Sequence, residues 1–509
     1  MNAPAAIPPG ITDRDLAAPP AIPVPSATGV DARIVLAGPG ARAIAFVLDW
    51  LIRTGLAIVW LLAAALLILG DLDFDVASDE EVLWYLLAAM PATAIYFLYH
   101  MILEPLMGGR TPGKRMIGLR VLTTEGTVPG VGALLTRNVF RLIDSLPVCY
   151  VVGLLFVMFG KRHTRLGDLA AGTVLAVERA PFLEKLDAER GEPAKHRAWR
   201  EARDRAAGLG RRHGSDVPDA LRVIADYRAA ARELGAARES RAPDAARSAE
   251  HLEAVYSDLH DVIHRPPRRF LEMLLELFRD QVPAAVGRIR IHLLAVTLLF
   301  ITAAVTGFWL VYTFPDLIAM FADPKLIATV ERGELWTDGL LNVTPSAVLS
   351  VSILTNNIVV SLFAFCSGVV FGLGTFYLIG FNGLSLGAIF AFTGQHGLAG
   401  RLFDFIIAHG CVELSCICIA GAAGALLGEA LIRPGEHTRA EAFRIAAGDG
   451  VRIMVAVTLL LLGCGFIEGF VSPDPEIPRW ARATIGAGYF LFMISFLRGY
   501  VFGRSRRAR

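Results

Sequence analysis

The first long apolar stretch of the sequence, residues 44–70, reads IAFVLDWLIRTGLAIVWLLAAALLILG. A helix needs about 20 apolar residues to cross the ~30 Å hydrocarbon core of a bilayer, so this stretch predicts a transmembrane span. Further windows of the same character lie near residues 83–103, 291–314, 350–378, 381–398, 403–428, 451–471 and 483–503. The sequence therefore predicts an all-α polytopic membrane protein with about eight transmembrane helices.

The composition supports a membrane protein. The 509 residues are 54% hydrophobic and 19% charged, whereas soluble domains are roughly 45–50% apolar and about 25% charged. The charged residues concentrate between positions 180 and 290 and are scarce in the apolar windows. A net charge of +1 excludes a globally basic nucleic-acid-binding protein, so we expect no nucleic-acid partner.

The distribution of Arg and Lys orients the chain, because these residues collect on the cytoplasmic side of membrane proteins. The acidic loop 71–82 should lie outside, whereas the Arg-rich segments 104–141 and 161–290 should lie inside. The C-terminal tail is also basic. We therefore predict that both termini are cytoplasmic.

A weaker apolar window covers residues 139–160 and is interrupted by Asp144 and Pro147. A single crossing at this window would put the following Arg-rich segment outside the membrane, against the charge rule. We therefore interpret it as a re-entrant or interfacial hairpin that turns near Pro147.

Four segments follow from these patterns. We predict a disordered tail, a first membrane domain, a cytosolic helical segment that ends in an amphipathic helix, and a six-helix membrane domain; their ranges are 1–40, 41–178, 179–290 and 291–509. The amphipathic helix, within residues 270–288, is expected to lie on the membrane surface or to pack on the cytosolic helices.

Four blocks in the first half occur in a specific order. Arg42 and Asp49 open the first span, and they are followed by RTPGKR at 110–115, RNVFRLID at 137–144 and RLGDLAAGT at 165–173. In this order, the blocks resemble the RDD family. The name of the family records one Arg and two Asp. Arg42 and Asp49 match the Arg and the first Asp, and the second Asp is either Asp144 or Asp168. The resemblance implies a small membrane domain for which ligand or ion transport is often proposed.

Charged residues in an apolar helix must find a partner or a wet cavity. Arg42 and Asp49 are two helical turns apart, so they are interpreted as a buried structural pair or as a functional proton or cation site. Lys114 and Arg115 are interpreted as interface anchors, because the TPGK sequence lacks the full phosphate-loop motif.

The second half contains a series of polar and glycine-rich motifs in apolar surroundings, namely Asn356-Asn357, GFNGLSLG at 380–387, HGCVE at 409–413, GAAGA at 421–425 and Glu468. In this order, the motifs resemble the stage II sporulation protein M family. His409 and Glu413 are four residues apart and share one face of a helix. Asn356, Asn357, Asn382 and Glu468 are candidates to meet them inside the bundle. Together these residues predict either a polar path for a proton, an ion or a lipid headgroup, or interhelical hydrogen bonds that only stabilise packing.

No enzymatic motif is recognisable. HGCVE lacks the second His of H-E-x-x-H, and no G-x-S-x-G is present. We predict a protein that is not an enzyme, with no catalytic residue, no cofactor and no metal site. The glycines at 368, 372, 374, 421 and 424 are expected to allow close helix packing.

The two resemblances imply a bacterial protein of the cytoplasmic (inner) membrane. Relatives of the second half act in cell-envelope complexes and are often associated with MoxR-type ATPases, for which residues 180–290 would form the docking surface. We expect a non-enzymatic membrane scaffold in an envelope or ATPase-linked complex, in contact with membrane lipids and with a possible second copy of the chain. The alternative is a transporter or channel that moves an ion, a proton or a small or lipid ligand through a polar path.

Overall fold

The computed structural model describes residues 21–24, 32–68, 84–145, 151–159, 164–177, 217–240, 270–335, 346–474 and 476–503, with short pieces between 199 and 260. Within this part of the chain, seven helices are long and apolar enough to cross a membrane, which confirms an all-α polytopic membrane protein. They are α2 (Pro39–Ile68), the helix Leu87–Leu106 that contains α4 (Met90–Leu106), α16 (Arg290–Thr313), α19 (Leu373–Gln395), α21 (Gly410–Ile432), α22 (Arg439–Phe470) and α23 (Arg479–Leu497).

A further long helix, α18 (Ser346–Cys366), packs against α21 and α22, and its described apolar part, Thr355–Val369, is shorter than a full span. The turn that follows comes earlier than the apolar windows predict. Phe371 and Gly372 have φ angles of 53° and 82°, a left-handed conformation that ends a helix. The chain therefore reverses after η4 (Ser367–Val369), and Gly380 lies inside α19.

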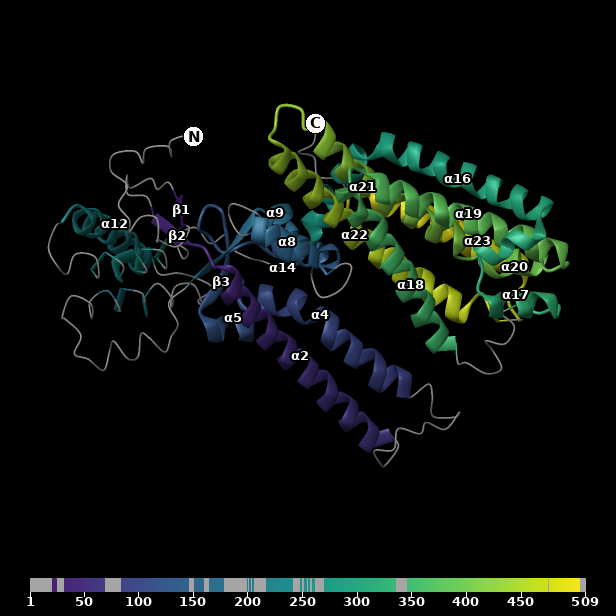
Figure 1. The fold of residues 1–509 in the computed structure, drawn as a ribbon, viewed down its shortest axis with the longest axis horizontal. Helices are drawn as coiled ribbons and strands as arrows, with labels where there is room; N and C mark the ends of the chain where they lie inside the picture. Colours follow the sequence, from purple (N-terminus) through teal and green to yellow (C-terminus); the bar gives the residue numbers. More distant parts are fainter. Residues whose placement is uncertain are drawn as a thin grey trace, which may run out of the picture.

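In the first half, α2 and α4 run side by side (Figure 1), and η1 (Tyr85–Ala89) leads into α4. The TPGKRMIG sequence then forms the short helix α5 (Pro112–Ile117). The Thr111 side chain caps this helix by accepting a hydrogen bond from the backbone N–H of Lys114. Pro112 favours the first helical turn, and Gly118, with φ 71°, ends the helix.

Two small antiparallel sheets accompany the helices. In the first half, β3 (Leu119–Thr123) pairs with β4 (Thr173–Val177), and β1 (Ala21–Val24) pairs with β2 (Ala32–Val35). The backbone N–H of Ala37 donates to the carbonyl of Leu175, which ties the start of α2 to β4. These strands were not expected from the sequence, since apolar runs this short have no distinctive periodicity, and β1 and β2 lie within the predicted tail.

Four short helices complete the first half: α6 (Val131–Val139), α7 (Arg141–Asp144), α8 (Val151–Phe159) and α9 (Leu166–Ala171). Helices α7 and α8 pack against each other. Pro147, the predicted turn between them, lies outside the described residues, so the re-entrant or interfacial hairpin stays a prediction.

In the second half, glycines allow very close helix contacts. A Cβ atom on Gly387 of α19 would lie 1.9 Å from the carbonyl oxygen of Ala304 on α16, and one on Gly368 would lie 2.1 Å from that of Gly424 on α21. The close packing predicted for Gly368 and Gly424 is confirmed. η3 (Pro315–Met320), α17 (Pro324–Glu331) and α20 (Ala399–Ile406) gather at one end of the bundle (Figure 1).

The two membrane halves share one hydrophobic core. The ring of Phe140, after α6, lies 5.5 Å from the ring of Phe365 on α18 and 5.7 Å from that of Phe443 on α22. Helices α6 and α9 both pack against α22. The halves are therefore not independent units joined only by the intervening segment.

The predicted amphipathic helix consists of α14 (Phe270–Glu276), the π-helical turn η2 (Leu277–Gln281) and α15 (Val282–Arg288). Phe278 is buried against Phe496 of α23 and Phe502 of η5 (Tyr500–Phe502). Met273, Leu274 and Leu275 are exposed. One part of this helix thus packs on the membrane bundle, while its first part presents apolar side chains outward.

The segment predicted to be cytosolic contributes α12 (Val217–Glu239) and a small core of its own, which includes Leu234 and Leu259. The Tyr227 hydroxyl lies 2.7 Å from the Tyr256 hydroxyl and 3.0 Å from Nδ1 of His260.

Candidate functional site

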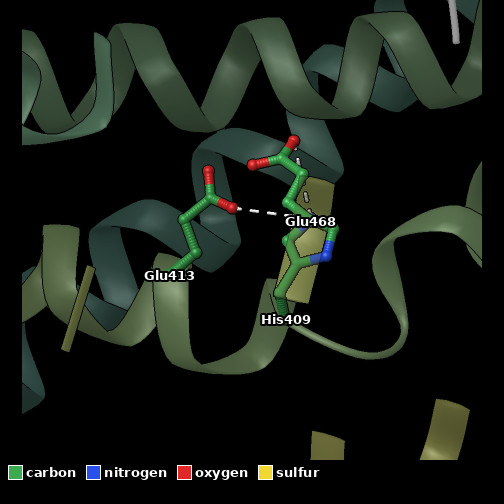
Figure 2. A group of neighbouring side chains, drawn as sticks. All are labelled: His409, Glu413 and Glu468. Atoms are coloured by element: carbon green, nitrogen blue, oxygen red, sulfur yellow. Dashed lines mark ion pairs between the residues drawn. The ribbon is translucent and has the colours of Figure 1, made fainter. Parts of the chain in front are cut away.

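Three titratable side chains meet at one end of the second-half bundle. His409 directly precedes α21, Glu413 lies in the first turn of α21, and Glu468 lies in the last turn of α22. Both carboxylates approach the imidazole ring (Figure 2): Nε2 of His409 is 3.7 Å from Oε2 of Glu413 and 3.9 Å from Oε1 of Glu468. We refer to these three residues as the carboxylate–imidazole centre.

Two neighbours orient this centre. Nδ1 of His409 lies 3.0 Å from the hydroxyl of Ser472, and the amide of Asn357 on α18 donates to Oε1 of Glu413 at 2.6 Å. If Nδ1 carries the proton that it donates to Ser472, the lone pair of Nε2 faces both carboxylates. Such an arrangement is repulsive unless a cation lies between the three groups.

The two carboxylates of the centre face a histidine and no described Lys or Arg. Among the described residues, no Lys or Arg forms an ion pair with Glu413 or Glu468, although His409 and Glu468 are buried. A buried carboxylate in a membrane domain is costly unless it is paired or protonated. The centre therefore requires a cation, either a proton or a metal ion.

The donor set is suitable for a metal ion. One ligand atom from each of His409, Glu413 and Glu468 can be chosen so that all three lie within 4.8 Å of one another. Ligands about 2.1 Å from a tetrahedral ion are roughly 3.4 Å apart, so a small closure would bring them to metal distance. One imidazole nitrogen and two carboxylate oxygens suit Zn²⁺, Mn²⁺ or Fe²⁺ and leave a position open. The sequence predicted no metal site, because these ligands follow no short motif.

Of the other candidates from the second half, one contacts the centre and two do not. Asn357 joins the centre, but Asn356 is exposed. The Asn382 amide donates to the Leu378 carbonyl in its own helix at 2.8 Å and does not reach the centre.

The first half contains a different arrangement, a chain of alternating charges that we call the buried charge network. Arg42 Nη1 lies 3.0 Å from Asp168, Arg137 bonds Asp168 and Glu104 at 2.6 Å each, and Lys114 is ion-paired with Glu104. Arg137, Glu104 and Asp168 are almost completely buried. Each carboxylate of the buried charge network faces a Lys or Arg, in contrast to the carboxylates of the carboxylate–imidazole centre.

The predicted pair between Arg42 and Asp49 is wrong. Seven residues of helix rise by about 10.5 Å, so the two groups cannot meet along one face. Arg42 pairs with Asp168 instead, whereas Asp49 accepts hydrogen bonds from the Tyr99 hydroxyl, the Thr111 hydroxyl and the Gly113 backbone at 3.0, 2.5 and 2.8 Å.

Two further sequence interpretations can be compared with the network. Lys114, interpreted as an interface anchor, is buried against Glu104, whereas Arg115 is exposed. Asp144 accepts a hydrogen bond from the Leu166 backbone at 3.2 Å, and its other oxygen lies 3.6 Å from Arg165. Of the two candidates for the second family Asp, it is therefore Asp168 that bonds Arg42.

Burial and crowding shift the pKa values in this network. Burial alone would raise the pKa of Asp168, but Arg137, Arg42 and Arg165 outweigh it and hold that pKa well below its usual range. Burial lowers the pKa of Lys114 to about 7, although Glu104 favours its charged form.

A cavity of about 250 Å³ adjoins the network. Its lining includes Arg42, Asp49 and Asp144, three of the residues singled out from the sequence, together with apolar side chains such as Phe46 and Val157.

Several site residues escaped the sequence analysis. Glu104 and Arg137 lie at the edges of apolar windows, where charges usually face the membrane interface, and Ser472 lies in an ordinary polar loop. The sequence indicates only that each buried polar or charged residue needs a partner. It does not identify which residue is that partner.

The family comparisons match both halves of the chain. Residues 36–172 match the RDD family and residues 296–473 match Stage II sporulation protein M. Comparison with curated proteins and with solved structures gave no match. The first matched segment contains the whole buried charge network, and the second contains the carboxylate–imidazole centre. The chain is thus a fusion of an RDD family domain with a Stage II sporulation protein M domain.

Proposed function

We propose that the protein is a cation transporter of the bacterial inner membrane, with the carboxylate–imidazole centre as its binding site. The observation that carries the proposal is that two carboxylates face one imidazole nitrogen with no Lys or Arg ion pair among the described residues. A bound cation would offset the repulsion between the two carboxylates and the Nε2 lone pair. The mixed nitrogen and oxygen donors favour a divalent transition metal over Ca²⁺ or Mg²⁺, which prefer oxygen ligands.

The position of the centre suits entry from one side of the membrane. It lies where α21 begins and α22 ends, so the connection between Ile432 and Arg439 is at the opposite end of these helices. With the C-terminus on the predicted cytoplasmic side, α23 begins and α22 ends towards the outer compartment, so the centre faces that compartment.

Polar groups continue from the centre into the bundle. Ser361 lies one helical turn beyond Asn357 on α18 and is completely buried. Its hydroxyl oxygen has no hydrogen-bond partner among the described residues. A hydroxyl in this position can bind an ion or water that has left Glu413, and it supports a path along α18.

The test is ion flux into proteoliposomes that contain the purified full-length chain. Zn²⁺ and Mn²⁺ uptake would be followed with a metal-sensitive dye and proton movement with a pH dye. We expect metal uptake by the wild type, loss of uptake in Glu413→Gln and Glu468→Gln, and retention in Glu476→Gln, which changes an exposed carboxylate eight residues after Glu468. Proton flux without metal uptake would reassign the cation to H⁺. No flux above empty liposomes would reject the transporter.

A scaffold is the second candidate, favoured by the shared core and by the cytosolic segment with its own core. In this function the chain would bind a MoxR-type ATPase through residues 180–290, with membrane lipids and a second copy of the chain as further partners. It predicts a stable complex with such an ATPase in size-exclusion chromatography, weakened by Tyr227→Ala and unchanged by Glu413→Gln. The transporter hypothesis predicts instead that ion flux is lost in Glu413→Gln and unchanged in Tyr227→Ala.

A further inference from the structure

We propose that the cavity of the RDD domain binds a phosphate oxyanion, held by Arg42, Arg141 and Arg165. The proposal concerns the first half of the chain and does not depend on cation transport by the second. It rests on three observations: the charge of the cavity lining, guanidinium nitrogens without hydrogen-bond partners, and the position of the cavity in the fold.

The cavity lining carries an excess of positive charge. Five cations line it, namely Arg42, Lys114, Arg137, Arg141 and Arg165, against the two carboxylates Asp49 and Asp144. Among the described residues, the ion pairs behind the lining add the carboxylates of Glu104 and Asp168. With all nine of these groups charged and His100 neutral, the described residues named here carry a net charge of +1. A monoanion in the cavity would balance this group of residues.

Two of these arginines are incompletely satisfied. Nη2 of Arg42, and both Nε and Nη2 of Arg165, are buried and have no hydrogen-bond partner among the described residues. The nearest acids of Arg165 lie at 3.6 and 3.8 Å, beyond hydrogen-bond distance. Buried donors are normally paired, and the planar guanidinium fork matches phosphate oxygens. A phosphate group would supply several acceptors at once.

The two acids in the lining do not prevent anion binding. Both oxygens of Asp49 already accept hydrogen bonds from Tyr99, Thr111 and Gly113. Burial raises the pKa of Asp144, although Arg165 lowers it, so the carboxyl is more readily neutral than an exposed one.

The position of the cavity indicates where the phosphate comes from. The cavity lies beside the first turns of α2 and includes the apolar side chains of Phe46, Val157 and Leu175. In the predicted orientation this end of α2 is cytoplasmic, at the level of the anionic headgroups. At ~30 Å³ per water, its volume equals about eight waters, enough for an oxyanion with part of an ester. The ligand is therefore a phosphodiester headgroup of an anionic lipid or free phosphate.

The test is binding to the delipidated full-length chain in detergent, by native mass spectrometry and thermal unfolding. The probes are phosphatidylglycerol, inorganic phosphate and, as a comparison, the zwitterionic phosphatidylcholine. We expect one phosphatidylglycerol or one phosphate per chain and a raised Tm. A response to phosphatidylglycerol alone assigns the lipid headgroup, and a response to phosphate alone assigns the free ion. A response to neither, or equal binding of phosphatidylcholine, overturns the proposal.

Variants locate the site. Arg165→Gln removes unpaired donors, and the loss of a charge-assisted contact should weaken binding roughly tenfold or more. Arg165→Lys keeps the positive charge and should give an intermediate affinity. It also tests the Arg165 contact if the Gln variant does not fold. Arg115→Gln is the matched control, because Arg115 is exposed and lies outside the cavity lining. Unchanged affinity in both Arg165 variants would overturn the assignment.

Discussion

Nε2 of His409 lies 3.7 Å from Oε2 of Glu413, across a gap too wide for a hydrogen bond. Glu468 faces the same nitrogen at 3.9 Å. In the RDD domain, by contrast, Arg137 bonds Asp168 at 2.6 Å. The two halves thus treat buried acids differently. The first pairs them with arginine, whereas the second places two of them around one imidazole nitrogen, with no Lys or Arg ion pair among the described residues.

This contrast predicts that removing a carboxylate destabilises the protein far more in the first half than in the second. Asp168→Asn leaves Arg42 and Arg137 without their acid and should destabilise the protein by about 3–5 kcal/mol. Glu468→Gln removes one of two like charges and should cost about 1 kcal/mol or less in metal-free buffer. Thermal unfolding in detergent, with fluorescence as the readout, compares the two variants. Equal destabilisation would contradict the contrast.

The network should also make stability depend on pH. The pKa of Asp168 in the folded protein is depressed below the ordinary value of about 3.9. Ionised Asp168 therefore contributes stability above about pH 4, and this contribution is lost as the pH falls towards the folded pKa. The Tm difference between wild type and Asp168→Asn should be largest near neutral pH and shrink below about pH 4. A difference that grows on acidification would give the wrong sign.

The shared core predicts that one aromatic residue couples the two halves. Phe140 is completely buried between Phe365 and Phe443, and Phe140→Ala should cost about 3–5 kcal/mol. Limited proteolysis should then separate the halves more readily. Phe97→Ala is the control, because Phe97 is 65% exposed on α4. Equal proteolysis of both variants would argue against coupling through Phe140.

Helix packing in the second half can be tested with two glycines of α19. A methyl group on Gly387 would collide with the Ala304 carbonyl, whereas one on Gly380 meets nothing within 4 Å. Gly387→Ala should therefore destabilise by about 1–3 kcal/mol through overpacking. Gly380→Ala should be neutral or slightly stabilising, since Ala favours helix. The Tm values of the two variants decide between these outcomes.

The sequence predicts those features that depend on local pattern. Apolar length identifies the spans, and the four-residue spacing of His409 and Glu413 places them on one face. Glu468 could be selected because a lone acid in an apolar span needs a partner.

The sequence did not reveal which residues far apart in the chain form ion pairs. Arg42 and Asp168 are separated by 126 positions, and the nearer Asp49 was the obvious but wrong partner. The turn at Gly372 was misplaced, because a left-handed residue is chosen by packing and many glycines in this half would permit it. The β3–β4 pair is likewise set by contacts between distant segments.

The most direct test of the central claim is equilibrium metal binding to the purified full-length protein. Isothermal titration with Zn²⁺ and Mn²⁺ should show one ion bound per chain at the carboxylate–imidazole centre. Binding should be lost in Glu413→Gln and Glu468→Gln and retained in Glu476→Gln. Absence of binding to the wild type, or equal binding by all four proteins, would contradict a metal ion at this centre.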